Sequence, residues 1–183
     1  CGEGGLILTN NKKIAERACQ YHDHGHMNLP DVPRGMDKAG MPGFNYRMTE
    51  MQAAVGQVQL TKLDFILNEN KKRHESLESI GNRFELREIF PDSSPSYDTF
   101  IFKVEDTELR EKIVKHLNKT GIGTKNLPDA MQWHCAYYWG HILPNEQVQR
   151  AKETNEKLAN YIAIPIWLKK PVNEYKELAI AIS

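Results

Sequence analysis

Gly43-Phe44-Asn45-Tyr46-Arg47-Met48-Thr49-Glu50-Met51-Gln52-Ala53-Ala54 is the stretch that decides the fold. Thr49 and Gln52 have the spacing of a capping box, in which the hydroxyl accepts from an exposed backbone N–H and the amide reaches back, so a helix is predicted to start here. Asn45 and Arg47 precede that start, where unpaired N–H groups and the helix dipole attract anions, and a guanidinium suits phosphate or carboxylate. Two interpretations stay open from these residues alone: an anion site, or a capped helix preceded by a hydrogen-bonded loop.

The helix that starts at Thr49 is predicted to be long. Small residues near its start allow close packing, and apolar residues recur at roughly helical spacing. We expect it to run to about Ile80 and to link two domains. Its apolar positions are Met51, Val55, Val58 and Leu63.

Upstream of this helix the pattern is mixed. Residues 2–5 indicate a turn, 6–9 a short buried strand and 12–20 a helix. Residues 21–48 are rich in glycine and proline and lack periodicity, which is typical of a functional loop when aromatic residues and histidines are also present.

Downstream, short strand patterns alternate with helix patterns, which predicts an α/β or α+β domain. In residues 97–104 the alternation places Phe100, Phe102 and Val104 on one face, and Asp106 or Thr107 is expected to cap the next helix. The expected elements are strands over 84–89 and 97–104, a helix around Leu109–Leu117, a strand after Gly123, a helix over 144–161, a strand over 162–166 and a helix over 172–182.

Composition excludes several classes of protein. Lys plus Arg equals Asp plus Glu at 24 each, which argues against a nucleic-acid binder. The three cysteines are too scattered for a disulfide framework, and a reduced, cytoplasmic location is expected. The sequence contains neither an apolar run long enough to span a membrane nor a signal peptide, so no membrane association is expected.

Residues 43–54 resemble the signature of the DegT/DnrJ/StrS family of sugar aminotransferases. Residues 2–9 are similar to that family's Gly-Glu-Gly-Gly turn and strand, and His24-Gly25, residues 59–64 and Ile164-Pro165 follow in the family's order. The resemblance implies an α/β fold, the C-terminal part of a type I aminotransferase dependent on pyridoxal phosphate. Residues 1–80 would be the end of the large domain with an active-site loop and the long linking helix, and 81–183 a small α+β domain.

The resemblance also implies a reaction. The family moves an amino group from an amino acid, usually glutamate, to a keto-sugar that is most often nucleotide-linked. It works as a homodimer with shared active sites and uses pyridoxal phosphate as cofactor. The family's cofactor lysine lies a few residues before the Gly-Glu-Gly-Gly turn, which falls upstream of Cys1 here. We therefore expect a fragment that is inactive alone and holds no catalytic residue. The alternative is a non-catalytic keto-sugar-binding or regulatory module.

Site residues follow from the same resemblance. Asn45 matches the asparagine that reaches the cofactor phosphate of the neighbouring subunit, with a loop-fixing amide as the alternative. Arg47 would bind substrate phosphate or carboxylate, with a structural salt bridge as the alternative. Lys125, Asn126 and His134 are candidate substrate contacts. Asn126-Leu127 stands where His-Tyr is usual, which resembles a subgroup that aminates an eight-carbon keto-deoxy sugar acid.

Other chemistry-bearing residues have plainer interpretations. His22, His24 and His26 alternate and could share one face for a metal, but a polar loop is preferred and no metal is expected. The aromatic run over 133–139 suits a carbohydrate face, although core packing is commoner. Cys19 and Cys135 are expected to be small buried hydrophobes.

Overall fold

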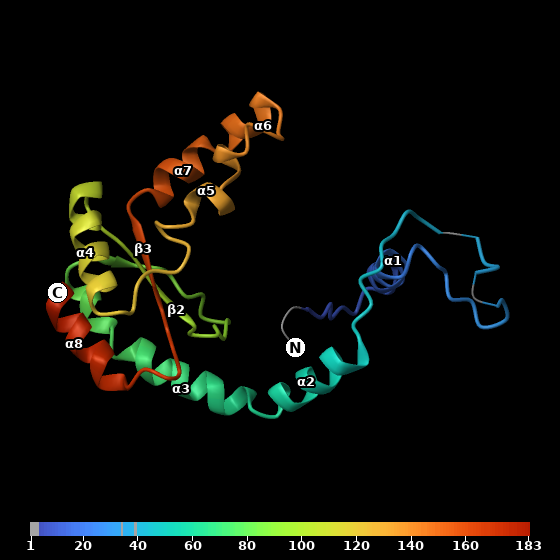
Figure 1. The fold of residues 1–183 in the computed structure, drawn as a ribbon, viewed down its shortest axis with the longest axis horizontal. Helices are drawn as coiled ribbons and strands as arrows, with labels where there is room; N and C mark the ends of the chain where they lie inside the picture. The colour runs from blue at the N-terminus through green and yellow to red at the C-terminus, as the bar shows by residue number, and fades with distance from the viewer. Residues whose placement is uncertain (1–3, 34, 39) are drawn as a thin grey trace. The chain divides into compact units, whose positions relative to one another are not determined.

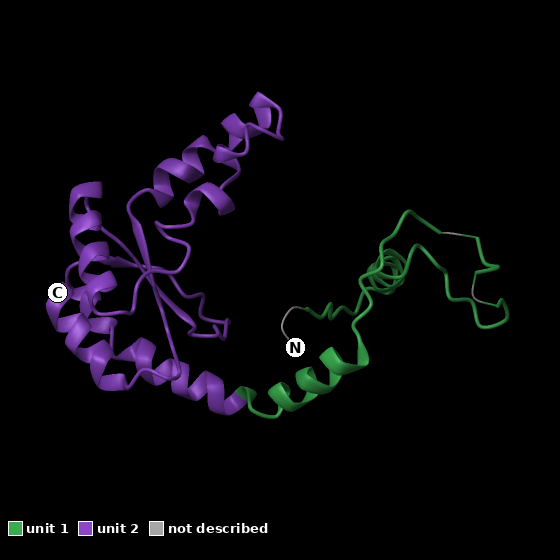
Figure 2. Ribbon diagram, in the orientation of Figure 1, with its two compact units in different colours: residues 1–63 green, residues 64–183 purple. Residues whose placement is uncertain are grey.

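The computed structural model describes residues 4–33, 35–38 and 40–183, so part of the turn expected at 2–5 lies outside the described residues. The chain forms two compact units, residues 1–63 and 64–183 (Figure 2).

Two helices form the regular part of the first unit. Helix α1, Lys12–His22, starts where the Asn11 side chain accepts from two backbone N–H groups of the first turn. Helix α2, Glu50–Leu60, starts at Thr49 with the predicted capping box, because Thr49 Oγ1 accepts from the Gln52 backbone and Gln52 Oε1 accepts from the Thr49 backbone. Both predicted helix starts are confirmed.

The prediction of a strand over residues 6–9 is wrong. This segment has no regular structure, and Leu6, Ile7 and Leu8 are 74%, 71% and 91% exposed. A strand persists only where a neighbouring strand takes up its backbone hydrogen bonds. All the strands assigned in the described residues lie in the second unit, so this apolar run has no sheet to join in its own unit.

The predicted long helix is interrupted. Helix α2 ends at Leu60, and α3 spans Leu63–Glu75. Between them the Thr61 hydroxyl donates to the Val58 carbonyl at 2.8 Å, a side-chain bond that competes with helix continuation. The 3-10 helix η1, Glu78–Asn82, follows α3.

The second unit is built on a three-stranded antiparallel sheet with the order β1-β2-β3. Phe100 pairs with Ile164, and Phe102 pairs with Ile162. The sequence placed these strands correctly but overestimated β1. The strands are β1 Glu85–Leu86, β2 Thr99–Lys103 and β3 Tyr161–Pro165.

The helices of this unit follow the predicted order, but the short helices over Met131–His134 and Ala136–Tyr138 were not predicted, and two further differences occur. The helix expected over 144–161 breaks at Ala151. The strand expected after Gly123 is not assigned, although the Lys125 N–H donates to the Ala163 carbonyl and the Ala163 N–H donates to the Leu127 carbonyl. The helices are α4 Thr107–Lys119, α5 Met131–His134, η2 Ala136–Tyr138, α6 Asn145–Arg150, α7 Lys152–Leu158 and α8 Val172–Ile182.

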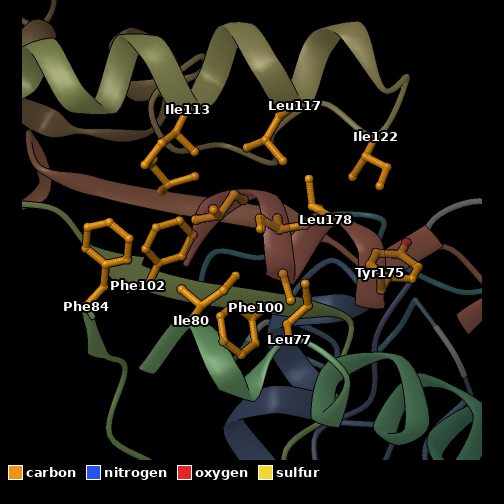
Figure 3. Close-up of a cluster of buried hydrophobic side chains, with 14 of the residues drawn as sticks. Leu77, Ile80, Phe84, Phe100, Phe102, Ile113, Leu117, Ile122, Tyr175 and Leu178 are labelled. Atoms are coloured by element: carbon orange, nitrogen blue, oxygen red, sulfur yellow. The ribbon is translucent and has the colours of Figure 1, made fainter. Parts of the chain in front are cut away.

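The core of this unit lies between the sheet, α4, α8 and η1. Phe100, Phe102 and Val104 are buried on one face, as the alternation predicted. Figure 3 shows Ile113 and Leu117 directed from α4 toward the cluster that contains these rings. Helix α4 lies against β3, and α8 packs on η1 (Figure 1). The predicted apolar face of α4 is therefore confirmed.

Residues 64–80 pack with the C-terminal unit. Arg73 of α3 donates to the carbonyls of Leu168 and Lys170, and Ile80 of η1 is fully buried in the core. The compact units consequently divide between Leu63 and Asp64. The domain division of the complete enzyme at 80 and 81 stays a prediction.

His74 introduces a pH dependence into this core. The side chain is buried, and burial, reinforced by the positive charge of Arg87 and opposed by Glu75, lowers its pKa. A folded state that binds this proton more weakly than the unfolded state loses stability as the pH falls. We expect the free energy of unfolding to fall as the pH drops below about 6.5, the ordinary pKa of histidine.

The measurement is urea unfolding of the chain at several pH values between neutral and mildly acidic. His74→Phe should flatten the acid loss, because the titrating group is removed, whereas His141→Gln, at an exposed histidine, should leave the slope unchanged. Equal slopes for the wild type and His74→Phe would contradict the assignment.

Candidate functional site

The loop after α1 folds back on itself and brings the signature beside the end of that helix. Phe44 N–H donates to the Tyr21 carbonyl at 2.8 Å, and Tyr46 N–H donates to the His22 carbonyl at 2.9 Å. Asp23 and Asn45 form an antiparallel bridge. A Cβ at Gly43 would lie 2.4 Å from the Gly25 nitrogen, so this close approach requires glycine at position 43.

Asn45, Arg47 and Asp23 form one polar cluster, here called the Asn45 cluster. Arg47 Nε donates to Asn45 Oδ1 at 3.0 Å, and an Arg47 terminal nitrogen lies 3.0 Å from Asp23 Oδ1. Arginine only donates, so the amide oxygen of Asn45 must face it. The Nδ2 group of Asn45 makes no hydrogen bond to the described residues and remains available as a donor pair.

Arg47 and Asn45 therefore have different roles in this cluster. Arg47 is held in an ion pair with a largely buried carboxylate, and the Arg47 side chain is 38% exposed. Asn45 is exposed and is oriented by Arg47. An exposed amide with its donors available and its orientation fixed is suited to hydrogen-bond an oxyanion such as a phosphate.

Aromatic residues flank Asn45 in the sequence, and their rings contact each other and Tyr21. Tyr21 lies 5.5 Å from Phe44 and 6.0 Å from Tyr46, measured between ring centroids, and Phe44 and Tyr46 are stacked at 5.5 Å. Phe44 and Tyr46 are 53% and 62% exposed. The loop thus presents accessible rings on both sides of Asn45 in the sequence.

Of the three alternating histidines, His24 and His26 lie with their rings edge-on, 6.2 Å apart between centroids. His22 Nδ1 donates to the Cys19 carbonyl at 2.6 Å, and His26 Nδ1 lies 3.0 Å from Asp37 Oδ1. His24 has a left-handed backbone, with φ of 55°. Across residues 4–33, 35–38 and 40–183, no group of three or more His, Cys, Asp or Glu side chains is placed to hold a metal ion.

The two described cysteines differ. Cys135 is 6% exposed, as expected for a small buried hydrophobe. The expectation is wrong for Cys19, which is exposed on α1, because that helix has no buried residue in its unit.

Lys125 and Asn126 lie together beside β3 in the second unit. The Lys125 ammonium contacts Asp98 Oδ2 at 2.6 Å. This hydrogen bond, with a second from Ser96, holds the pKa of Asp98 below its usual value. Asn126 has φ of 68°, and its carbonyl accepts from the Ala130 N–H. Lys125 is half-exposed and Asn126 is exposed. Since Lys125 is already paired with Asp98, it would have to share Asp98 with any anion it binds.

His134 lies on α5 and is exposed. Next to it in sequence is a pocket of about 650 Å³ whose lining is largely aromatic. His134 does not line this pocket, whereas His141 does. The lining residues are Gln132, Trp133, Tyr138, Trp139, His141 and Ile142.

The sequence identified the aromatic run but not Asp23, Asp98 or His141. No sequence pattern near Asp23 or Asp98 indicates a role, because the cation that each pairs with is distant in sequence and is brought to it only by the fold. His141 could have been found by extending the aromatic run to Ile142. The two groups of candidates, the Asn45 cluster and residues 125–134, belong to different compact units.

The chain is similar to a known protein family and to several solved structures. The chain matches the DegT/DnrJ/EryC1/StrS aminotransferase family over residues 1–180. It resembles the solved structure of DesV from S. venezuelae at 23% identity with a TM-score of 0.67, covering 96% of this chain and 44% of DesV. It also resembles GDP-4-keto-6-deoxy-D-mannose-3-dehydratase from E. coli with bound hydrated pyridoxal phosphate, at 18% identity and a TM-score of 0.70, covering 96% and 49%.

A third similar structure is Helicobacter pylori PseC, an aminotransferase involved in the biosynthesis of pseudoaminic acid, at 17% identity and a TM-score of 0.64, covering 95% and 46%. The chain thus spans about half the length of the solved structures it matches. These likenesses confirm the predicted fold class. Among the helices of the described part of the chain, none is long and apolar enough to cross a membrane.

The capped helix behind Asn45, the strand and helix order of the second unit and the match over residues 1–180 lead to one assignment: the chain belongs to the DegT/DnrJ/EryC1/StrS aminotransferase family.

Proposed function

We propose that this chain supplies one half of a sugar aminotransferase that uses pyridoxal phosphate and moves an amino group from an amino acid, glutamate in our proposal, to a keto-sugar. The single observation that carries the proposal is the family match over residues 1–180, combined with an exposed Asn45 whose Nδ2 donors are available. Because the chain covers about half of the similar structures, we further propose that it does not transaminate alone.

The residues present fit the cofactor at its phosphate end. Pyridoxal phosphate provides the electron sink that makes amino-group transfer possible. Asn45 would hold the phosphate of the cofactor bound by the neighbouring subunit. Arg47 positions that amide by occupying its oxygen, and Asp23 in turn fixes Arg47. We therefore assign Arg47 a positioning role here, and contact with a substrate anion would be additional.

A homodimer follows from this assignment, since Asn45 would serve the partner's cofactor. The apolar residues of α2 support an interface, because they are exposed on this chain. Met51 is 79% exposed, Val55 48% and Val58 54%. A row of exposed apolar residues on one helix commonly marks an interaction surface.

The proposed substrate contacts lie in the second unit. Lys125 carries the positive charge and Asn126 the amide suited to a sugar carboxylate or phosphate, and exposed His134 adds a further donor. An eight-carbon keto-deoxy sugar acid provides a carboxylate for Lys125, and the alternative substrate is a nucleotide-linked keto-sugar. The pocket lined by Trp133, Tyr138 and Trp139 offers aromatic faces for a sugar ring.

The test is reconstitution. The chain is mixed with a separately produced N-terminal half that contains the cofactor lysine, and amino transfer from glutamate to each keto-sugar is measured. We expect activity only in the mixture. Transamination by the chain alone would contradict its role as one half, and conversion of the sugar by dehydration without amino transfer would contradict the aminotransferase assignment.

A non-catalytic keto-sugar-binding module is the second candidate, favoured by the aromatic pocket of about 650 Å³. Its expected signature is saturable quenching of tryptophan fluorescence by a keto-sugar, lost in Trp133→Ala, together with no activity in the reconstituted mixture. Restored amino transfer would exclude the module as the function.

A further inference from the structure

A second pocket, here called the His74 pocket, lies within the C-terminal unit and has a volume of about 390 Å³. This size lies within the range of small-molecule sites, which run from roughly 300 to 1,000 Å³. It shares no residue with the candidates at 45, 47, 125, 126 and 134. Its lining residues are His74, Glu78, Gly81, Leu86, Arg87, Ile89, Phe100 and Ile101.

His74 is the buried polar group of this pocket. Its ring is 9% exposed and lies edge-on to Tyr97 at 5.2 Å and to Phe100 at 4.9 Å, measured between centroids. Its Nδ1 atom is buried without a hydrogen-bond partner. A buried polar atom left unpaired costs free energy, so a ligand that bonds Nδ1 would gain more there than at an exposed group.

The burial of His74 and the charge of Arg87 lower its pKa, so the ring is neutral at pH 7. A neutral imidazole nitrogen can donate or accept one hydrogen bond, depending on the tautomer. The ring therefore presents no charge of its own, and the charges in the pocket come from Glu78 and Arg87.

Glu78 and Arg87 are opposite charges on the rim. Both are exposed, and neither makes an ion pair with any residue of the described ranges. The side chains of Leu86, Ile89 and Phe100 supply the apolar part of the lining. Figure 3 places Phe100 beside Leu77 and Ile80 in the core. One anionic group, one cationic group and an apolar wall complement a small zwitterion that has an apolar side chain.

We propose that the His74 pocket binds a free α-amino acid with an apolar side chain, whose carboxylate pairs with Arg87, whose ammonium pairs with Glu78 and whose side chain packs on Leu86, Ile89 and Phe100. A guanidinium can pair with a carboxylate through two parallel hydrogen bonds. The proposal is independent of the aminotransferase assignment, because it rests only on this pocket.

The experiment titrates the 183-residue chain, labelled with ¹⁵N, with L-leucine, with L-leucinamide, which lacks the carboxylate, and with 4-methylpentanoate, which lacks the ammonium. We expect L-leucine to bind best and to shift the backbone signals of Gly81, Arg87 and Ile101. Arg87→Gln should weaken L-leucine and 4-methylpentanoate about tenfold, because a charge-assisted hydrogen bond is lost. Glu78→Gln should weaken L-leucine and L-leucinamide but not 4-methylpentanoate.

Both variants change exposed residues, so the fold is retained. Arg150→Gln is the matched control, because it removes the same charge from an exposed ion pair on α6. Absence of L-leucine binding, equal binding of the three probes, or the same affinity in Arg87→Gln as in Arg150→Gln would each overturn the proposal.

Discussion

Replacing Asn45 with aspartate in the dimeric enzyme proposed above is expected to weaken pyridoxal phosphate binding about a hundredfold. Aspartate has the shape of asparagine and keeps an oxygen for Arg47 Nε, which lies 3.0 Å from Asn45 Oδ1 in the wild type. The donor pair of Nδ2, however, is replaced by a carboxylate oxygen that carries negative charge. The phosphate would lose a charge-assisted hydrogen bond and face a like charge.

The magnitude follows from two contributions. A hydrogen bond to a charged group contributes about 1.5–3 kcal/mol, and two unit charges 4 Å apart near a protein surface repel by up to about 4 kcal/mol before screening by salt. A net loss of about 3 kcal/mol corresponds to roughly a hundredfold in affinity. Asn45→Ala, which loses only the hydrogen bond, should weaken binding about tenfold.

The measurement is the equilibrium affinity for the cofactor, followed by its absorbance during dialysis of the dimer. Asn10→Asp provides the control, because it adds the same charge at an exposed position of the same unit. Raising the ionic strength should recover part of the loss in Asn45→Asp. Equal cofactor affinities in Asn45→Asp and Asn10→Asp would show that Asn45 only fixes the loop.

Local features of this chain were predictable because their causes lie within a few residues. The capping box at Thr49 and Gln52 was recognised from a spacing of three. A cap at Asp106 or Thr107 was predicted from neighbouring residues, and the structure has it at Asp106. The alternation of Phe100, Phe102 and Val104 was also recognised from residues close in sequence. The prediction of a strand over residues 6–9 was wrong because a strand depends on distant segments: it is stable only if other strands lie beside it.

The candidate site shows the same limit. Asn45 and Arg47 were recognised from the signature, but their mutual hydrogen bond and the ion pair with Asp23 depend on a loop that folds back over some twenty residues. Lys125 was selected without its partner Asp98, which lies on the far side of a helix in sequence. The sequence could therefore name candidate residues, whereas the side chains that hold them in place could be found only from the fold.

Arg73 is the strongest case of a long-range partner, and its removal is expected to destabilise the C-terminal unit by about 4 kcal/mol, as breaking a buried charged network does. Its side chain is 8% exposed. Nε donates to the Lys170 carbonyl at 2.8 Å, and one terminal nitrogen donates to the Leu168 carbonyl at 2.9 Å. The other terminal nitrogen contacts the carbonyl and the carboxylate of Glu69, each at 2.8 Å.

These bonds fix the segment between β3 and α8 against α3. The same segment is held from the other side by Tyr175, whose hydroxyl accepts from the Trp167 N–H and donates to the Pro165 carbonyl. Arg73→Ala would leave the Leu168 and Lys170 carbonyls without their donors and would remove one of the two cations that pair with Glu69, the other being Lys72. Arg73→Lys keeps the charge, but an ammonium lacks the planar fork that reaches both carbonyls, so we expect a loss of about 2 kcal/mol.

The measurement is urea unfolding of the chain, with the dependence on urea concentration compared between variants to confirm that the same surface is exposed. Lys71→Ala is the control on the same helix, because Lys71 forms an exposed pair with Glu75 and should change stability by less than about 0.5 kcal/mol. If Arg73→Ala unfolds at the same urea concentration as Lys71→Ala, α3 is not anchored through this side chain. The apolar contacts of Leu77 and Ile80 would then suffice to hold the chain after α3 in the C-terminal unit.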